Sequence, residues 1–418
     1  MASLIGAAGQ DGSDGADGRG IVSIAKTGTL DNVDTYTITY TSGASSTFTV
    51  TNGSNGTNGT GGQGVQNYFA AKARYSNTDY THNNTNYFAT FLHITDIHDD
   101  AIRYERAREI ADYLKVDGVL MTGDIVAGVG TDDFSFVTDI EASFSTPLYT
   151  SVGNHDRYGL DEDTAFTKYY SLFANRYDYK TIAGTSGMNY YVDLADKKLR
   201  IISLNLYGYV DGSTVKGHYP HYRQDYIIAL TSMLNSTPTN YGVIIICHAP
   251  EKGLNRSYDY DIFKQPETFF WTNGSEYTTL TEIVDAFISR SSISKTHINT
   301  MTDNSSITVN ADFSSVNSGV EFIGWVTGHT HTDNIAYVPN TANKQLMLNM
   351  ACSGLQQDST YDINYYNDLG RDEYCETQDL LNAYIIDREN KVVKVVRIGA
   401  HLTYDLVDRN YMAIPYAD

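Results

Sequence analysis

Short apolar runs alternate with stretches of helical spacing from about residue 86 to the carboxyl terminus. The clearest strand is Tyr241–Cys247 (YGVIIIC), and the clearest helix is Ala101–Leu114, where apolar residues recur at helical intervals. Strands that alternate with helices build a layered α/β domain, and ligands bind such domains outside the strand ends. The pattern therefore predicts a layered α/β domain over residues 88–418.

The remaining elements of this domain follow from the same alternation. Further strands are expected at Phe88–Thr95, Gly118–Met121, Pro147–Val152, Phe322–Thr327 and Gln345–Met350, with a hairpin of Ala383–Asp387 and Val392–Ile398 and a helix at Arg223–Leu234. The stretch 251–320 is polar and irregular around one expected helix, Thr279–Ser289. We expect this stretch to be an insertion over the functional site.

The first 64 residues differ from the rest, since they hold 14 of the 34 glycines and none of the seven prolines. Glycine recurs at every third place in two runs, which are Gly9, Gly12, Gly15 and Gly18, then Gly53, Gly56, Gly59 and Gly62. Only glycine fits where three polyproline-II-like chains meet at a common axis, so the runs predict collagen-like segments. A flexible linker rich in Gly, Ser and Asn is the alternative.

Between the two runs, Tyr36, Ile38 and Tyr40, and then Phe48 and Val50, alternate with polar residues, which predicts short strands. About 30 residues bury little apolar surface alone, so we expect this segment to associate with copies of itself. Residues 9–64 resemble modules that accompany collagen-like triplets in bacteriophage fibre and tail proteins and in bacterial surface proteins. The resemblance implies an attachment stalk over residues 1–66, a homotrimer, and a place on a virion or a bacterial surface. Residues 67–87 would be a linker.

The overall charge limits the partners. Lys and Arg number 29 and Asp and Glu 50, which gives a formal net charge of −21. Such a chain repels nucleic acid and anionic membranes, so no nucleic-acid partner is expected. Three cysteines make no disulfide framework and no apolar run approaches membrane-spanning length, so we expect neither a disulfide scaffold nor a membrane span.

Several predicted strands end in a short polar cluster. In chain order the clusters are Asp96-Ile97-His98, Gly123-Asp124, Gly153-Asn154-His155-Asp156, His248, and Gly328-His329-Thr330-His331. In an extended strand the two polar side chains of Asp-x-His share one face. The donors are nitrogen and oxygen without thiolate, which suits Mn, Fe, Zn or Ni, and they are numerous enough for two divalent ions. Two such ions can clamp the attacking and leaving oxygens of a phosphoryl transfer.

These five motifs, in this order, resemble those of the calcineurin-like metallophosphoesterases, over roughly residues 88–400. The resemblance implies a four-layer αββα sandwich and a metal-dependent hydrolase of phosphoric esters, either a phosphodiesterase or a phosphatase. It assigns Asp96, His98 and His331 to one metal, Asn154, His248 and His329 to the second, and Asp124 to both together with a bridging hydroxide. The expected catalytic residues are His155 and Asp156. His155 would be the general acid at the leaving group, and Asp156 would orient a neighbouring residue.

The motifs of this chain differ from those of two related groups of phosphatases. Purple acid phosphatases have a tyrosine where this chain has Ala127, and the protein phosphatases' arginine after the Gly-Asp motif is missing. The remaining Asp-x-His branch includes phosphodiesterases, nucleases and monoesterases, and the motifs do not select one. Outside the motifs, His93 is expected to be a packed histidine, and the loop of His218 and His221 is a candidate lining of the substrate pocket.

Three functions follow from these features. The first is a phosphoesterase carried on a stalk, acting on a phosphate ester such as one in a surface glycopolymer. The second is a cytoplasmic enzyme that cleaves cyclic nucleotides or other small molecules, and it leaves residues 1–66 unexplained. The third is a fibre or decoration protein that uses the domain only for binding.

Overall fold

The computed structural model describes residues 20–30, 33–51, 68, 88–127, 144–157, 178–208, 219–251, 277–300, 302–329, 334–338, 341–350, 353, 380–399 and 411–417. The chain divides into two compact units, Met1–Asn58 and Gly59–Asp418. Both glycine-triplet runs lie outside the described residues, as does the predicted linker apart from Tyr68.

The first unit contains an antiparallel sheet of three strands, β1 (Ile21–Leu30), β2 (Val33–Tyr40) and β3 (Ser45–Thr51), in that order. On one face Tyr36 stacks on Phe48 with ring centroids 5.3 Å apart. Ile24 lies opposite Ile38 on the same face. The strands predicted from the alternation in this segment are therefore present.

The second unit is built on two six-stranded sheets, here called sheet I and sheet II. Sheet I has the order β17 (Tyr411–Pro415), β16 (Val392–Gly399), β15 (Leu380–Asp387), β4 (Phe88–Ile94), β5 (Gly118–Met121), β6 (Leu148–Thr150). Sheet II has the order β13 (Asn334–Tyr337), β14 (Leu346–Asn349), β12 (Glu321–Thr327), β9 (Gly242–Cys247), β8 (Leu199–Leu204), β7 (Tyr190–Leu194). The runs β4-β5-β6 and β8-β9-β12-β14 are parallel.

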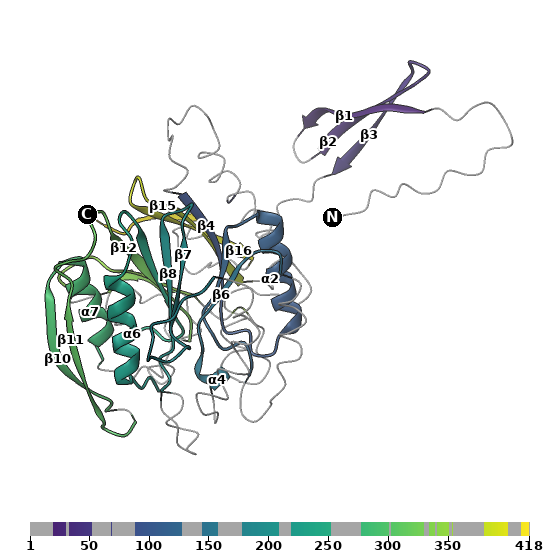
Figure 1. Ribbon diagram of the computed structural model, residues 1–418. Helices are drawn as coiled ribbons and strands as arrows, with labels where there is room; N and C mark the ends of the chain where they lie inside the picture. The colour runs from purple at the N-terminus through teal and green to yellow at the C-terminus, as the bar shows by residue number, and fades with distance from the viewer. Residues whose placement is uncertain are drawn as a thin grey trace. The chain divides into compact units, whose positions relative to one another are not determined.

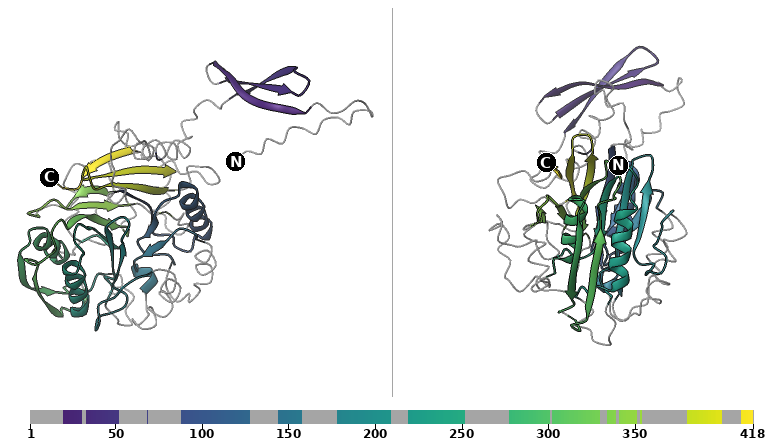
Figure 2. Two further views of the ribbon diagram at one scale, coloured as in Figure 1. Left: turned by 45° about the horizontal axis from the view of Figure 1, so that its top comes forward. Right: turned by 60° about the vertical axis from the view of Figure 1, so that its left-hand side comes forward.

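The two sheets pack face to face, and helices cover their outer faces (Figures 1 and 2). Leu120 and Tyr384 of sheet I line the same internal gap as Ile244 and Ile323 of sheet II. Helices α6 (Gln224–Asn235) and α7 (Thr279–Ile288) share an apolar cluster with the other face of sheet II. Helix α2 (Ala101–Leu114) buries four residues in the core of sheet I. The layers are therefore helix, sheet, sheet, helix, which is consistent with the four-layer sandwich that the resemblance to the metallophosphoesterases implies.

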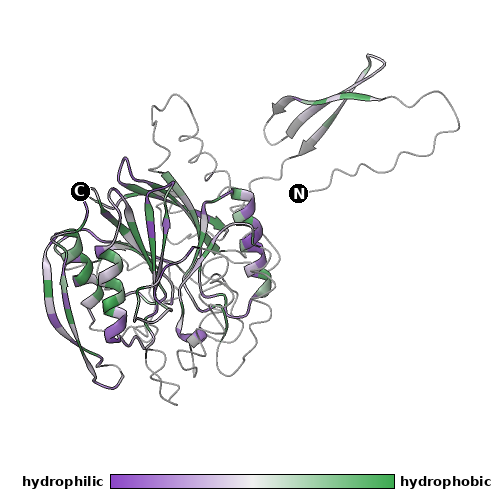
Figure 3. Cartoon of the chain, viewed as in Figure 1, coloured by the Kyte–Doolittle hydropathy of each residue, from purple (hydrophilic) through white to green (hydrophobic). Residues whose placement is uncertain are grey.

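The local sequence explains these elements. β9 is a fully buried run of six apolar residues at the centre of sheet II, which suits a parallel strand covered on both faces. Asp100 caps α2, because its side chain accepts a hydrogen bond from the backbone N–H of Arg103. Figure 3 shows central strands that are mostly hydrophobic and an α2 that carries both hydrophilic and hydrophobic residues. No helix in the described ranges is both long and apolar enough to cross a membrane.

The stretch expected to be irregular contains a regular hairpin. Strands β10 (Ser292–Ile298) and β11 (Ser306–Asp312) pair along their whole length beyond α7, so the expectation of irregular structure is wrong there. The alternation of polarity is strict in β11, where Ile307, Val309 and Ala311 alternate with exposed polar residues. It is weak in β10, where Lys295 and His297 occupy the less exposed positions. Residues 252–276 of the same stretch lie outside the described part.

Candidate metal centre

The polar clusters meet at one edge, where parallel strands of both sheets end. Asp96 and His98 follow β4, Asp124 follows β5, His155 lies in the short helix α4 (Asn154–Arg157) after β6, His248 follows β9, and His329 follows β12. Adjacent parallel strands bring their carboxyl ends to the same edge of a sheet. Face-to-face packing of the two sheets therefore brings five separate chain segments to one place.

Four of these residues have a left-handed backbone. The φ angles are 51° at Asp96, 48° at His98, 52° at Asp124 and 68° at His329, a region that residues other than glycine seldom adopt. β4 ends at Ile94, so the Asp-x-His pair lies in a turn after the strand. The expectation that an extended strand places both side chains on one face is therefore wrong.

Backbone hydrogen bonds between the strand-end loops hold this conformation. The N–H of Asp96 donates to the carbonyl of Gly123 at 3.0 Å, and the N–H of His98 donates to the carbonyl of Asp124 at 3.1 Å. Strained backbone of this kind persists where the surroundings over-determine it. The loops after β4 and β5 thus position one another.

Two glycines leave room for the carboxylates. A Cβ at Gly153 would lie 2.0 Å from Oδ1 of Asp124, and one at Gly328 would lie 2.5 Å from Oδ2 of Asp96. Both distances are far below van der Waals contact, so any larger residue would displace a carboxylate. This explains why glycine precedes Asn154 and His329 in their motifs.

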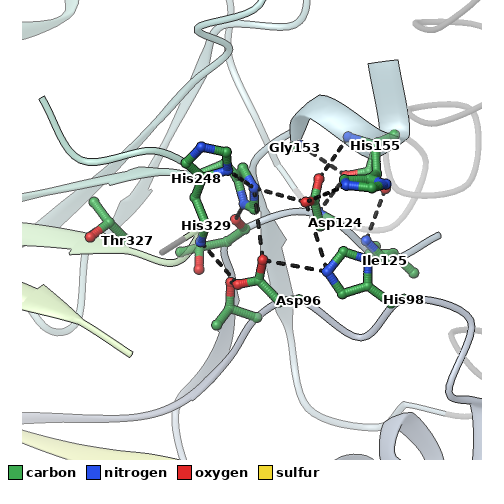
Figure 4. A network of polar contacts seen from close by, with 12 residues as sticks. Asp96, His98, Asp124, Ile125, Gly153, His155, His248, Thr327 and His329 are labelled. Atoms are coloured by element: carbon green, nitrogen blue, oxygen red, sulfur yellow. Dashed lines mark hydrogen bonds and ion pairs between the residues drawn. The ribbon is translucent and has the colours of Figure 1, made fainter. Parts of the chain in front are cut away.

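Two groups of donor atoms share Asp124 (Figure 4). In the first group, Oδ2 of Asp124 lies 3.9 Å from Nε2 of His98 and 3.9 Å from Nε2 of His155. In the second group, Nε2 of His248 lies 3.0 Å from Oδ2 of Asp124 and 3.2 Å from Nδ1 of His329. Within each group the donor atoms all lie within 4.8 Å of one another, which is compatible with one cation per group.

Asp96 lies between the two groups. Its Oδ1 is 3.7 Å from Nε2 of His98 and 3.9 Å from Nε2 of His248. Its Oδ2 accepts hydrogen bonds from the hydroxyl of Thr95 at 2.7 Å and from the N–H of His329 at 3.0 Å. Oδ1 is therefore the oxygen that faces the donors of both groups.

The donor set fits divalent metal ions. Asp96 and Asp124 are both buried, and without a cation only the imidazoles can offset their charge. Burial opposes ionisation of Asp124, but His248, His155 and His98 outweigh it and hold its pKa well below the usual range. Burial likewise opposes the charge of His248, yet Asp124 and Asp96 raise its pKa to about 9. In the absence of metal, a proton on His248 offsets part of the negative charge of Asp124 and Asp96. Cations bound to these donors would replace that proton.

A carbonyl group fixes the orientation of His248. Nδ1 of His248 lies 2.6 Å from the carbonyl oxygen of Thr122, so Nε2 is directed at Asp124. Metal-binding histidines commonly donate their second ring N–H to an acceptor of this kind, which fixes the tautomer. The side-chain hydroxyl of Thr122 in turn contacts Nε2 of His93 at 2.9 Å. His93 is thus the packed histidine that its position on the strand predicts, and it supports the residue that orients His248.

His155 is the most open member of the centre, with 25% of its side chain exposed. Its backbone N–H donates to Oδ1 of Asp124 at 2.8 Å, and its Nδ1 contacts the carbonyl of Ala127 at 2.5 Å. Nε2 is therefore the ring nitrogen directed toward the donors. This geometry places His155 at the solvent side of the first group.

Asp156 supports the loop of Asp124. Its Oδ2 accepts from the N–H groups of Asp124 and Gly153 at 2.8 and 2.9 Å, and its Oδ1 accepts from those of Ile125 and Val126 at 2.9 and 3.2 Å. Burial and the charge of Asp124 raise its pKa to about 6. Both carboxylate oxygens are used on backbone, which favours an orienting role.

The other site predictions are only partly covered. His331 and His218 lie outside the described residues. Asn154 is buried at the first position of α4, beside His155. His221 is also buried, and its Nδ1 contacts the hydroxyl of Thr302 at 2.7 Å.

Sequence reasoning missed Tyr207. It follows β8, and its ring centroid lies 6.0 Å from that of His248 and 6.5 Å from that of His329. Burial and the charge of Asp124 raise its pKa well above the usual range. The polar Asn205 follows β8, but Arg200 and Ser203 interrupt the apolar residues of that strand, so the strand-end signal is weaker than after β9.

Comparison with known proteins agrees with the geometry, because residues 89–333 match the calcineurin-like phosphoesterase family. The chain belongs to this family. No curated protein matches it. Family membership and the clustered Asp and His donors together support a metal-dependent phosphoester hydrolase of unspecified substrate.

Among solved structures, a dimetal phosphatase from Danio rerio is 11% identical, with a TM-score of 0.45, 79% of this chain covered and 99% of the other. An archaeal phosphodiesterase is also 11% identical, with a TM-score of 0.31 and 74% and 99% covered. A predicted phosphoesterase from Streptococcus pneumoniae is 10% identical, with a TM-score of 0.30 and 78% and 97% covered. Identities and TM-scores this low carry no information about the activity of this chain.

Proposed function

We propose that this calcineurin-like phosphoesterase binds two divalent metal ions and hydrolyses a phosphodiester or phosphomonoester. The observation that carries the proposal is the sharing of Asp124 by two groups of mostly buried donors. Asp96, His98 and His331 would hold one ion, and Asn154, His248 and His329 the other. Such a pair of ions supplies an activated water and neutralises charge on the phosphoryl group.

His155 is proposed to be the general acid. With Nδ1 bound to the carbonyl of Ala127, the imidazolium form would deliver its proton from Nε2 to the departing oxygen. The neutral form that results keeps its proton on Nδ1, where the carbonyl accepts it. Its partial exposure also suits this role, since the leaving group must reach it from solvent.

Two features of the chain bear on the substrate class. A phosphate ester of a surface glycopolymer is consistent with the stalk-like first unit, whereas the net charge of −21 opposes a polyanion. A cyclic nucleotide or another small diester meets less repulsion. We keep the glycopolymer ester as the proposal and the small diester as its alternative.

The test is hydrolysis of a chromogenic phosphodiester and its matched monoester by the full chain. It is run with Mn²⁺, with chelator, and with His155→Ala. His297→Gln is the control, because that ring lies between the hydroxyl of Thr279 and the amide of Asn299, and an amide side chain can replace it. We expect turnover that requires metal and falls about 100-fold or more in His155→Ala only. A protein that binds no metal would disprove the proposal.

Association of three chains through the first unit is also proposed. Ile21, Val22 and Ile24 of β1 are 56%, 63% and 54% exposed, so association with copies of the chain could bury their side chains. Glycine at every third place on both sides of this sheet suits three chains around one axis. Attachment to a virion or bacterial surface would follow from such a stalk.

A further inference from the structure

The hydroxyl of Tyr207 is buried without a partner. The side chain is 1% exposed, and within the described part of the chain nothing lies at hydrogen-bond distance from the hydroxyl. Buried polar side-chain atoms nearly always have a partner, and an exception calls for an explanation. A ligand oxygen is one explanation, provided that the hydroxyl lies beside a site.

Tyr207 lies beside the second donor group of the metal centre. Its ring is tilted against both imidazoles of that group, with centroids 6.0 Å from His248 and 6.5 Å from His329. His155 belongs to the other donor group, with His98. A phosphoryl group bound across the centre would therefore have His155 on one side and Tyr207 on the other.

The backbone of Tyr207 is fixed before any ligand binds. Its N–H donates to Oδ1 of Asn205 at 2.9 Å, and Nδ2 of Asn205 donates to the hydroxyl of Tyr226 at 3.0 Å. The next residue, Gly208, donates its N–H to the carbonyl of His221 at 3.1 Å. A donor held in this way loses little entropy when it binds a ligand, as efficient electrostatic catalysis requires.

The neighbouring groups cannot serve as its acceptor. Nδ1 of His248 already contacts the carbonyl of Thr122, and Nε2 faces Asp124 and His329. His329 is the other ring beside Tyr207, and no hydrogen bond joins it to the hydroxyl either. A substrate can supply the missing acceptor, since a phosphoryl group has non-bridging oxygens to offer. We propose that the hydroxyl of Tyr207 donates a hydrogen bond to a non-bridging oxygen of the phosphoryl group bound at the metal centre. This inference rests on the proposed phosphoesterase function.

The role differs from those already assigned. A phenol is a neutral donor, so Tyr207 adds no charge to the centre and needs no counterion. Its hydrogen bond strengthens as negative charge accumulates on the phosphoryl oxygens. Tyr207 would then be a catalytic residue that raises kcat more than it lowers KM.

The test compares Tyr207→Phe with Tyr416→Phe. Tyr416 is equally buried, but its hydroxyl donates to Glu321 at the start of β12, away from the strand end that carries His329. Four quantities are measured in the full chain: kcat and KM with Mn²⁺, the number of Mn²⁺ bound, the binding of inorganic phosphate to the Mn²⁺-loaded protein, and the Tm of the metal-free protein.

We expect Tyr207→Phe to lower kcat about 10- to 100-fold, to weaken phosphate binding, and to leave two Mn²⁺ bound. Its metal-free Tm should be unchanged or higher, because an unpartnered buried hydroxyl is removed. Tyr416→Phe should show the reverse, with a lower Tm and unchanged kcat. These opposite patterns separate a substrate contact from a structural one.

Two results would overturn the inference. One is a Tyr207→Phe protein with kcat and phosphate affinity within about two-fold of the parent. The other is loss of a Mn²⁺ ion in that variant, which would make Tyr207 a metal ligand. If the parent binds two Mn²⁺ but hydrolyses no ester, the proposed function fails, and phosphate binding still decides the role of Tyr207.

Discussion

At Asp124 the backbone has a φ of 52°, and the side chain faces imidazoles from three different loops. A residue in so unfavourable a conformation needs support from its neighbours. Asp156 provides it, since its carboxylate binds the backbone of Asp124 and of the two residues that follow. A carboxylate outside the donor groups therefore determines where the shared carboxylate lies.

Asp156→Asn tests this dependence. An amide has one acceptor oxygen, so two of the four backbone N–H groups around position 156 lose their acceptor. We expect the free energy of unfolding to fall by about 3 kcal/mol and metal binding to weaken. Urea unfolding and calorimetric Mn²⁺ titration measure the two effects. The exposed Asp178→Asn is the control, and an equal loss there would contradict the argument.

His93 predicts a pH dependence of stability. Burial lowers its pKa to about 3, against 6.5 in the unfolded chain. As the pH falls through 6.5, the unfolded chain takes up a proton first, so stability is complete above pH 6.5 and is lost progressively toward pH 3. Between pH 7.5 and 5.5 this single group should cost about 1.4 kcal/mol.

His93→Gln removes that term while an amide side chain can still reach the hydroxyl of Thr122 or Tyr384. Urea unfolding of both proteins at pH 7.5 and 5.5 checks it. The parent should lose about 1.4 kcal/mol more than the variant between the two pH values. An equal loss in both proteins would mean that His93 does not titrate as its burial requires.

At the scale of elements, the strand-end loops determine the site, and Gly153→Ala tests how tightly they meet. The added methyl would lie 2.0 Å from Oδ1 and 2.3 Å from the backbone N of Asp124, so the loops after β5 and β6 must separate. We expect Mn²⁺ affinity to fall about 10- to 100-fold, measured by calorimetry. Gly28→Ala is the control, because its methyl meets only Thr35 at 3.9 Å. Unchanged Mn²⁺ affinity in Gly153→Ala would show that the loops can move apart without disturbing the metal centre.

Strong periodicity makes the central elements predictable. The spans of α2 and β5 match the predicted ranges, and those of β9 and β12 differ by one residue at one end. The hairpin of β7 and β8 and that of β10 and β11 are not among the predicted elements. In β8 the polar residues Arg200 and Ser203 interrupt the apolar pattern, and in β10 Lys295 and His297 occupy the less exposed positions. In β11, Ile307, Val309 and Ala311 alternate with polar residues, so this strand does carry a signal in its sequence.

In the site, the order of the motifs is predictable from the sequence, whereas the backbone conformation that orients the side chains depends on tertiary packing. Ordered motifs after buried strands are sufficient to predict that Asp96, Asp124 and His248 lie close together. The left-handed backbone that aims Asp96 depends on hydrogen bonds to the loop of Gly123, far along the chain. Tyr207 belongs to no motif, and its proposed role depends on its unpartnered hydroxyl and on the two rings beside it.

At the scale of the whole molecule, the described strands of the first unit expose apolar side chains. Ile24 is 54% exposed, and it lies opposite Ile38 on one face of β1 and β2. Thr39, on the other face, pairs with Ser23. Three such faces packed together would bury these isoleucines, and the flanking glycine triplets fit the same number of chains.

Ile24→Lys should therefore dissociate the full chain, since it would bury three ammonium groups at one axis. Thr39→Lys adds the same charge on the opposite face and should leave the oligomer intact. Light scattering after gel filtration, at several protein concentrations, gives the mass of each. We expect a trimer for the parent and Thr39→Lys, and a monomer for Ile24→Lys.

The kcat per chain should stay the same in all three proteins, because the proposed catalytic residues all lie in Gly59–Asp418. A monomeric parent would exclude the trimer, and dissociation by both variants would show that charge, and not the apolar face, controls assembly.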